Sequence, residues 1–537
     1  MTHPWTRRSI RFAASCALGA LLMTSAQATR FTPAPPKVQI SQGELSGKLA
    51  DGVRAYLGVP YAAPPVGELR WQSPQPPADW SGTRDGRAFR DRCAQPLSFL
   101  SPKSVNEDCL YLNVHVPDDI GGEKLPVMVW IHGGAFLSGA AADYDMVQLA
   151  RKARAVVVSI NYRLGAFGFF RAPELAAQHQ SSNLGLQDQQ AALRWVQSQI
   201  GQFGGDASRV TLFGHSAGGA SVCLHTVSPQ SQGLFQRAIM QSGTCGLLTS
   251  TPPEAMAAQS ARLGVQLGCP NGPGQLACLR DKPAAEVLKA SVPNGNEVKD
   301  VEVRWAPVRD GVTLLEDPGQ QVRQGRFHRV PMMIGTTRDE GDLFVGTEYH
   351  LAAFRTIRQA DVEFYIGQIA GSDTSRAAQL RSTYAAQAYG SLDRAFSALL
   401  TDYFFSCDSL QETQAFSRQV PTYTYEFSET GLPFLFQDPL MRLGSLHGAE
   451  LIFLFQSSKQ TWPMLFWNKA QKQLSDQLIG YWGRFAATGN PNGPHLPSWP
   501  AFSSQRDSIL NIRSSGNSVL GTAEFRQSHQ CNVFDPS

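Results

Sequence analysis

One pentapeptide, Gly214-His215-Ser216-Ala217-Gly218, holds the residues with the clearest capacity for chemistry. A serine hydroxyl is a weak nucleophile, so an enzyme that uses one needs a base to accept its proton and a third group to orient that base. An apolar run precedes this serine, and an Ala- and Gly-rich stretch that can begin a helix follows it. This context predicts a catalytic serine at a strand-to-helix turn, rather than a glycine-rich turn of an ordinary Rossmann-like unit.

The base is not expected to be His215, although it is adjacent to the serine. Neighbouring residues on a tight turn project in different directions, and the base must also reach an acidic partner. We therefore expect His215 to support the site from the side of the pocket. The histidines that follow Ser216, and so are candidates for the base, are His225, His328, His350, His447, His495 and His529.

Its local sequence favours His447 among these histidines, and chain order is consistent with that choice. Hydrolases with a serine at such a turn carry their catalytic residues in the order Ser, then Asp or Glu, then His. His447 lies between a loop with Gly and Ser and an apolar run, and the glycine after it would let its loop swing over the serine. For the acid, Asp339, Glu340 and Asp342 all follow the predicted strand Val330–Thr336, and spacing alone does not choose among them.

A glycine-rich turn supplies the remaining chemistry. The segment Trp130–Phe136, WIHGGAF, follows an apolar run. Such turns present backbone N–H groups to the oxyanion of a tetrahedral intermediate, and small residues keep side chains out of the way. We expect Gly133 to shape the turn, and the N–H donors to be Gly134, Ala135 and Ala217.

Alternating strand and helix patterns must position these groups. Apolar and β-branched runs predict six strands, at Leu125–Ile131, Ala155–Tyr162, Arg209–Gly214, Phe235–Gly243, Val330–Thr336 and Thr422–Phe427. Between the second and third strands, Leu193, Val196 and Ile200 recur at helical spacing. The alternation predicts an α/β fold of the α/β-hydrolase type, with a large, mostly parallel central sheet and helices on both faces. Residues 246–330 and 345–420 are expected to be helical excursions that form a cleft.

The first 28 residues have the pattern of an export signal. Arg7, Arg8 and Arg11 precede or begin the short apolar run Phe12–Met23, and Ala26-Gln27-Ala28 fits a cleavage site. The apolar run is too short to span a bilayer comfortably. We expect residues 1–28 to be a signal peptide and the product to be periplasmic or secreted from a bacterium. The arginine pair hints at the twin-arginine route.

The remaining composition excludes several classes of partner. Cleavage after Ala28 would lower Lys plus Arg from 47 to 44, equal to the 44 Asp plus Glu, so we expect no nucleic acid and no anionic membrane partner. No second apolar segment is long enough to span a membrane, so we expect no stable membrane insertion. No CxxC or HExxH pattern occurs, and we expect neither a metal nor a cofactor. The sequence makes no prediction about the oligomeric state.

With these residues in place, the chain resembles a type-B carboxylesterase, of the cholinesterase-like branch of the α/β-hydrolases. The resemblance rests on NYRLGAFGF, GNPNG and the ranges Tyr56–Trp71, Asn106–Val114 and Phe203–Gly218. It covers nearly the whole mature chain and implies a single domain over residues 29–537. It also implies that Glu340 is the acid and that His447 is the base.

The resemblance further implies three disulfides, Cys93–Cys109, Cys269–Cys278 and Cys407–Cys531. Cys223 and Cys245 are then left, either paired with each other or as buried thiols. Cleavage would remove one of the nine cysteines, and the even number that is left suits an exported chain.

The chain departs from the family pattern beside the serine. The family usually has glutamate where His215 stands, and that glutamate supports the active-site hydrogen bonds together with a serine at the position of Ser242. A histidine there changes the local charge and is expected to alter the acid limb of the rate profile. Phe136 and Phe344 are expected to line the substrate pocket. The segment Cys93–Cys109 is short and lacks tryptophan, which disfavours choline esters and a lipase lid.

These observations predict an exported serine carboxylesterase that hydrolyses small-molecule carboxylic esters through an acyl-enzyme, with a Ser-Glu-His triad. One alternative keeps the triad but assigns long-chain or bulky natural-product esters, as in a specialised esterase or lipase. A second alternative is a cholinesterase-like binding protein without activity. Such proteins usually lose a residue of the triad, whereas this chain keeps all three.

Overall fold

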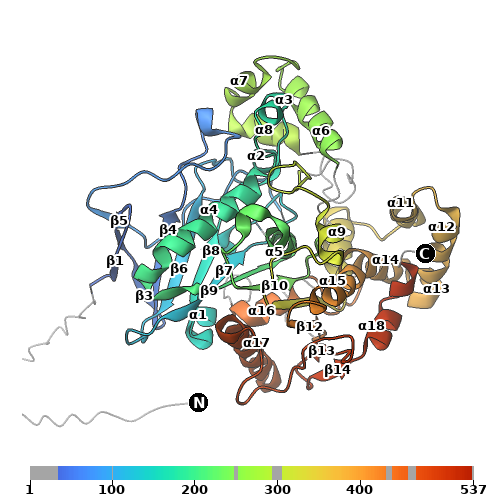
Figure 1. Ribbon diagram of the computed structural model, residues 1–537. Coiled ribbons are helices and arrows are strands. Elements are labelled where there is room, and N and C mark those ends of the chain that lie inside the picture. Colours follow the sequence, from blue (N-terminus) through green and yellow to red (C-terminus); the bar gives the residue numbers. More distant parts are fainter. Residues whose placement is uncertain are drawn as a thin grey trace, which may run out of the picture. The chain divides into compact units, whose positions relative to one another are not determined.

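Seven neighbouring strands run parallel in the middle of the central sheet of the computed structural model (Figure 1). The structure describes residues 34–98, 101–246, 252–292, 305–430, 438, 440–456 and 467–534. Within these residues, the parallel strands lie in the order β8 (Val156–Ile160), β7 (Leu125–Ile131), β9 (Gly205–His215), β10 (Arg237–Gln241), β11 (Met332–Thr337), β12 (Thr422–Phe427) and β13 (Ile509–Ile512).

Antiparallel strands extend both edges of this sheet. The strand β14 (Ser518–Leu520) pairs with β13. The opposite edge continues from β8 through β6 (Tyr111–Pro117), β4 (Val53–Pro60) and β3 (Lys48–Ala50). A separate small sheet is made of β1 (Lys37–Ile40), β2 (Gly43–Ser46) and β5 (Thr83–Asp85).

All six predicted strands are present, and they are β7, β8, β9, β10, β11 and β12. The strands β7 and β12 begin and end at the predicted residues. The predicted sheet with a parallel middle is therefore confirmed, whereas the antiparallel edge strands are an addition that the sequence pattern does not predict.

Alternate side chains of each central strand enter two different cores. In β7, Val127 and Val129 pack in a core with the helices α4 (Leu184–Gln199) and α5 (Ala217–Val227). Met128 and Trp130 point to the other face, where the covering helices are α1 (Val147–Ala153), α16 (Ala449–Phe455) and α17 (Lys469–Thr488). Figure 1 shows the sheet between these two sets of helices.

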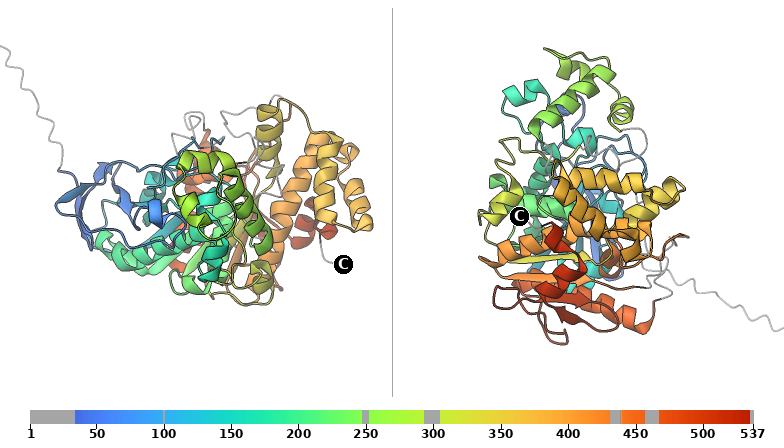
Figure 2. Two further views of the ribbon diagram at one scale, coloured as in Figure 1. Left: turned by 90° about the horizontal axis from the view of Figure 1, so that it is seen from above. Right: turned by 90° about the vertical axis from the view of Figure 1, so that its right-hand side faces the viewer.

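The two predicted excursions are helical. The first contains α6 (Pro253–Gln266), α7 (Gln275–Arg280), α8 (Ala284–Ser291) and α9 (Pro318–Arg323). The second contains α11 (Gln359–Ala370), α12 (Thr374–Thr383), α13 (Ala386–Tyr389), α14 (Leu392–Thr401) and α15 (Cys407–Ser417), with π-helical turns at Val345–Ala352 and Asp402–Ser406. Figure 2 gives two more views of these helices. The remaining short helices are α2 (Gly165–Gly168), α3 (Pro173–Ala177), α10 (Gly341–Phe344) and α18 (Thr522–Ser528).

The carboxyl ends of the parallel strands bring the predicted site residues to one edge of the sheet. Ile131, the last residue of β7, pairs with Gly214 of β9, so the turns that follow these strands are neighbours. The turn after β11 lies two strands further along the sheet. Open α/β sheets bind their ligands at this edge.

The predicted signal peptide lies outside the described residues and stays a prediction. Residues from Pro36 to Ser537 cluster as one compact unit. Among the described residues, no helix combines the length and the apolar character needed to cross a membrane.

Candidate active site

Ser216 lies at the tip of a sharp turn between β9 and α5. Its backbone has φ +57° and ψ −125°, a conformation that residues with a side chain rarely adopt. Hydrogen bonds hold the turn on both sides, because the Ser216 amide donates to the Gln241 carbonyl at 2.9 Å and the Ala220 amide donates to the Ser216 carbonyl at 2.8 Å. Ser216 is partly exposed, so the strained turn presents its hydroxyl to a substrate.

Close backbone approaches around the turn require glycine. A Cβ at Gly218 would overlap the carbonyl oxygen of Ile131. A Cβ at Gly133 would lie 3.0 Å from the Ser216 Cβ and 2.8 Å from the His215 carbonyl oxygen. The glycine-rich turn after β7 therefore packs directly on the serine turn.

The turn after β7 carries two of the backbone amides that we predict as donors to the oxyanion. Gly134 and Ala135 have φ of +112° and +54°, and within the described part of the chain their amides have no acceptor. The loop is closed instead by the Leu137 and Ser138 amides, which donate to the Gly134 carbonyl at 2.9 and 3.0 Å. Ala217 is the first residue of α5, and the first amides of a helix have no partner inside it.

Glu340 and His447 meet in a hydrogen bond of 2.5 Å between Oε2 and Nδ1. Glu340 follows β11 at the start of α10, and His447 precedes α16. The carboxyl group is fully buried, and its second oxygen accepts the Thr337 amide at 2.7 Å. The fold thus brings together two residues that are 107 positions apart. Within the described residues, no hydrogen bond engages the second imidazole nitrogen, Nε2.

Burial decides the charge of the imidazole. It lowers the pKa of His447 below the ordinary value of 6.5, because the imidazolium would lose its hydration. The ring is therefore neutral at neutral pH and able to accept a proton. Burial also raises the pKa of Glu340, while the Ser242 hydroxyl and the Thr337 amide oppose that rise. Ser242, predicted as a supporting residue, thus lies beside the acid.

Three rings surround the His447 imidazole. The ring centroids of His215, Phe405 and Phe344 lie 4.3, 4.9 and 5.3 Å from that of His447. His215 therefore packs beside the predicted base, and burial lowers the pKa of His215 well below its ordinary value. A neutral ring in this place supports His447 without adding charge. The contact with Phe405 was not expected, and nothing in the local sequence signals it.

The two predicted pocket residues differ in their surroundings. Phe344 is partly exposed and stacks on Phe405 with a centroid distance of 5.9 Å. Phe136 is fully buried and packs edge-on against Phe169 at 5.2 Å. Phe344 therefore has surface to offer a ligand, whereas Phe136 supports the glycine-rich turn from inside the core.

The two other candidate acids hold the loop that carries His447. The Ser445 amide donates to Asp339 Oδ2 at 2.8 Å, and the Asp339 amide donates to the Ser445 carbonyl at 3.0 Å. The Gly444 amide donates to Asp342 Oδ2 at 2.7 Å, and the Ser397 hydroxyl donates to its other oxygen, also at 2.7 Å. The three acids after β11 therefore have different roles around one histidine.

Three of the other candidate histidines have different partners. His225 is buried in α5 and bonds Ser231 and Gln189. His350 bonds Asp393 and Asp438. His529 bonds Asp402 and Glu426.

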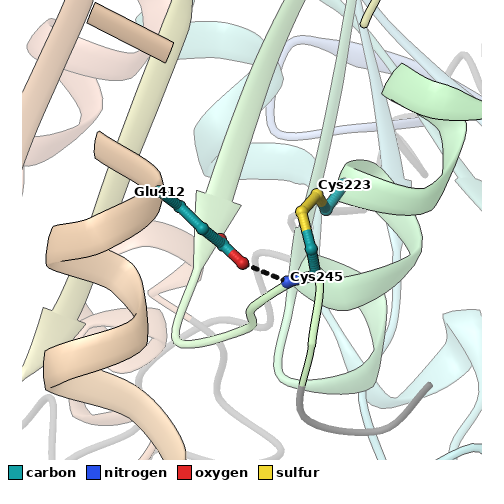
Figure 3. Close-up of side chains that lie close together, drawn as sticks. All are labelled: Cys223, Cys245 and Glu412. Atoms are coloured by element: carbon teal, nitrogen blue, oxygen red, sulfur yellow. Dashed lines mark hydrogen bonds between the residues drawn. A yellow bond between two sulfur atoms is a disulfide. The ribbon is translucent and has the colours of Figure 1, made fainter. Parts of the chain in front are cut away.

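Four disulfides join the eight cysteines of the described chain. Three are the pairs that the resemblance implies, Cys93–Cys109, Cys269–Cys278 and Cys407–Cys531. The fourth joins Cys223 to Cys245, a pairing that the sequence left open (Figure 3).

Glu412 lies next to this fourth disulfide, and its carboxyl accepts the Cys245 amide at 2.6 Å (Figure 3). Among the described residues, Cys223, Cys245 and Glu412 are the group whose ligand atoms lie close enough for a metal ion. Two sulfurs in a disulfide are not thiolates, so this cluster does not provide the ligands that a metal needs. Burial raises the pKa of Glu412, which favours its neutral form.

Comparisons with known proteins bear on the family of this chain. The model of the carboxylesterase family matches residues 34–534. The para-nitrobenzyl esterase of Bacillus subtilis (strain 168) is 34% identical over 499 residues, which are 89% of this chain and 94% of that protein. The pyrethroid hydrolase Ces2a of Mus musculus is 36% identical over 491 residues, which are 84% and 82% of the two chains.

A solved structure of a PNB esterase has the same architecture. It superposes with a TM-score of 0.77 at 33% identity, and the match covers 92% of this chain and 99% of that one. The fold is therefore that of the α/β-hydrolases. Since the family match spans nearly the whole described chain and the relatives exceed 30% identity over most of it, this chain belongs to the carboxylesterase family, whose members hydrolyse carboxylic esters.

Proposed function

We propose that the protein is an exported serine carboxylesterase that works through an acyl-enzyme, with Ser216 as nucleophile, His447 as base and Glu340 as acid. One observation carries the proposal. Glu340 and His447 share a hydrogen bond of 2.5 Å, and the imidazole packs on His215, the neighbour of the strained Ser216. A neutral imidazole that a carboxylate orients, packed on the residue before an accessible serine, suits nucleophilic attack on a carbonyl.

Acylation begins when Nε2 of His447 takes the proton of the Ser216 hydroxyl and Oγ attacks the ester carbonyl carbon. Nδ1–H donates to Glu340, which fixes the tautomer and stabilises the imidazolium. The carbonyl oxygen becomes an oxyanion, and its donors are the amides of Gly134, Ala135 and Ala217. The imidazolium then gives its proton to the leaving alkoxide, and an alcohol departs.

Deacylation repeats these steps with water. His447 takes a proton from a water molecule, whose oxygen attacks the acyl carbon. The second tetrahedral intermediate collapses, Ser216 recovers its proton from the imidazolium, and the carboxylic acid leaves. The proposed steps use only side chains, backbone amides and water.

The proposed substrates are uncharged carboxylic esters with apolar groups next to the carbonyl. Phe344 is partly exposed beside the imidazole and offers an aromatic face to such a group. The names of two relatives refer to para-nitrobenzyl esters and pyrethroids, both apolar. Export is supported by the four disulfides of the described chain, because disulfides persist in oxidising compartments.

Hydrolysis of p-nitrophenyl acetate tests the proposal. Ser216→Ala should lower kcat/KM by about 10⁴-fold or more, since it removes the nucleophile. Ser208→Ala, which changes an exposed serine of β9, the strand that leads to Ser216, should hydrolyse the ester as the unchanged protein does. His447→Gln should lose about as much as Ser216→Ala, whereas His215→Gln should keep substantial activity. Turnover by Ser216→Ala close to that of Ser208→Ala would refute the assignment.

A further inference from the structure

A second buried cluster of charged side chains is centred on His529, which directly follows α18. Its Nδ1 lies 2.8 Å from Asp402 Oδ1, and its Nε2 lies 2.8 Å from Glu426 Oε1. The side chains of His529, Asp402 and Glu426 are only 4%, 3% and 3% exposed. An ionised carboxylate only accepts hydrogen bonds, so both ring nitrogens carry protons and His529 is an imidazolium.

The other carboxylate oxygens of the cluster are also satisfied. The Tyr384 hydroxyl donates to Asp402 Oδ2 at 2.8 Å, and the Asn511 amide donates to Glu426 Oε2 at 2.9 Å. Burial alone would lower the pKa of His529, but hydrogen bonds and charges from Asp402 and Glu426 raise it to about 10. The two carboxyl groups therefore hold the His529 ring in its protonated form near pH 7.

Both carboxylates of this cluster stand on elements that hold the Glu340 turn. Thr401 immediately precedes Asp402, and its hydroxyl accepts the amide of Gly341, the residue after Glu340, at 2.9 Å. Glu426 of β12 pairs with Thr336, near the end of the strand β11 that leads to Glu340. The charge of His529 reaches the Glu340 carboxyl and favours its ionised form.

We propose that His529 is a positioning residue for ester hydrolysis, because its imidazolium ties the segment after α18 to two elements that hold the Glu340 turn and places a positive charge near the Glu340 carboxyl. An ionised Glu340 is what orients His447 and stabilises it when it becomes protonated. This inference rests on the proposed roles of Glu340 and His447.

Two other titratable groups lie near Glu340. Glu450 of α16 is fully buried, and burial together with the charge of Glu340 raises its pKa to about 8. Tyr425 of β12 has its pKa raised by burial and by the charges of Glu450 and Glu340. Both groups are neutral near pH 7, so they add no charge at Glu340.

The test is the pH dependence of kcat/KM for p-nitrophenyl acetate in two variants with opposite changes in charge. His529→Gln removes the positive charge that favours ionised Glu340, so Glu340 becomes neutral at a higher pH and the acid limb should move to higher pH by about half a unit or more. Asp402→Asn removes a negative charge but can still accept a hydrogen bond from His529. The acid limb of the Asp402→Asn pH profile should move to lower pH.

His225→Gln is the matched control. His225 is equally buried and has both ring nitrogens bonded, but its partners are the neutral Ser231 and Gln189. The same substitution there removes no charge, because burial lowers the pKa of His225 to about 3, so the acid limb should not move. If the substitutions at His529 and Asp402 acted only through lost packing, activity would fall, but the acid limbs of the two variants would not move in opposite directions.

Opposite shifts in His529→Gln and Asp402→Asn would support the inference. Unchanged limbs, or shifts in the same direction, would overturn it. If His529→Gln does not fold, Asp402→Asn decides by itself, with a shift to lower pH in favour and any other result against. The proposed function is tested separately. If the unchanged protein is active and Ser216→Ala is inactive, the proposed function stands even when this inference fails. An active Ser216→Ala variant would refute the proposed function itself.

Discussion

His447 can serve as a base only while its ring is neutral, and burial favours that state. Glu340 has the opposite influence, because a carboxylate 2.5 Å away stabilises the imidazolium. The pair thus combines a ring that is neutral at rest with a partner that stabilises its charge during the reaction. Activity should fall as the pH drops through the pKa of His447, below 6.5.

Glu340→Gln separates these two influences. The amide leaves the shape of the site nearly unchanged but removes the negative charge, so the imidazolium loses its main stabilisation. We expect kcat to fall about 10³-fold or more and the acid limb of the remaining activity to move to lower pH. The measurement is a pH profile of p-nitrophenyl acetate hydrolysis.

The exposed Glu123 provides the control for this change, since it forms an ion pair with Arg154 at the surface. Glu123→Gln should behave as the unchanged protein, because surface ion pairs contribute little. A Glu340→Gln variant with the same kcat as Glu123→Gln would show that another group orients His447.

Single residues could be predicted from the sequence only where a local pattern identifies them. Ser216 was identified by the glycines around it, whereas the choice of Glu340 over Asp339 and Asp342 needed the family resemblance. Spacing could not decide because all three carboxyls contact the His447 loop or His447 itself. The contact of Phe405 with His447 joins distant segments and leaves no mark in the sequence.

Two turns form the reactive edge of the sheet, and glycines determine how closely they approach. Gly133 contacts the serine turn at a distance that leaves no room for a methyl group. This contact sets the place of the amides of Gly134 and Ala135 relative to the Ser216 hydroxyl. We therefore expect the rate to depend on how closely the two turns pack, and not only on the presence of the donor amides.

Gly133→Ala tests this expectation. A Cβ would press on the His215 carbonyl oxygen and the Ser216 Cβ, and the two turns would have to separate. Displaced donors should lower kcat about 10²-fold, with a smaller change in KM, because they act mainly on the transition state. Steady-state kinetics and circular dichroism of the folded variant give the answer.

Gly367→Ala is the matched substitution, since a Cβ there meets no atom within 4 Å and the residue lies inside α11. It should leave the kinetics unchanged and slightly favour the helix. Equal kinetics of the two variants would mean that the turns tolerate separation.

The strands were predicted well where both faces of the sheet are covered. All residues of β7 and β12 are buried. β7 is a continuous apolar run, and β12 consists of Thr and Tyr residues in alternation, then Glu426 and Phe427, which suits a strand covered on both faces. The edge strands β3 and β14 have three residues each and no buried residue, and a pattern this short does not differ from a loop. The sequence predicts that both excursions are helical, but not where their helices begin and end.

At the scale of the whole molecule, covalent links join distant parts of the chain. The cysteines of Cys407–Cys531 are 124 positions apart in the sequence, whereas those of Cys269–Cys278 are only 9 apart. The longer link also holds the segment that carries His529 beside Asp402. Pairings of this kind followed from resemblance, because sequence alone does not reveal which cysteines meet.

Removing each link should have unequal effects on stability. A crosslink restricts the unfolded chain more when its loop is longer, so Cys407→Ala with Cys531→Ala should lower the free energy of unfolding by about 5 kcal/mol. Cys269→Ala with Cys278→Ala should cost about 2 kcal/mol less. Urea unfolding of both variants measures the difference, and equal losses would contradict the loop-length argument.

The central claim, that Ser216 is the nucleophile activated by His447, is tested most directly by an active-site label. A p-nitrophenyl phosphonate reacts with an activated serine and releases one equivalent of p-nitrophenol. We predict one phosphonyl group per chain, located by mass spectrometry on the peptide that contains Ser216, and none in Ser216→Ala. Stoichiometric labelling of the Ser216→Ala variant, or a label on any other residue of the unchanged protein, would contradict the account.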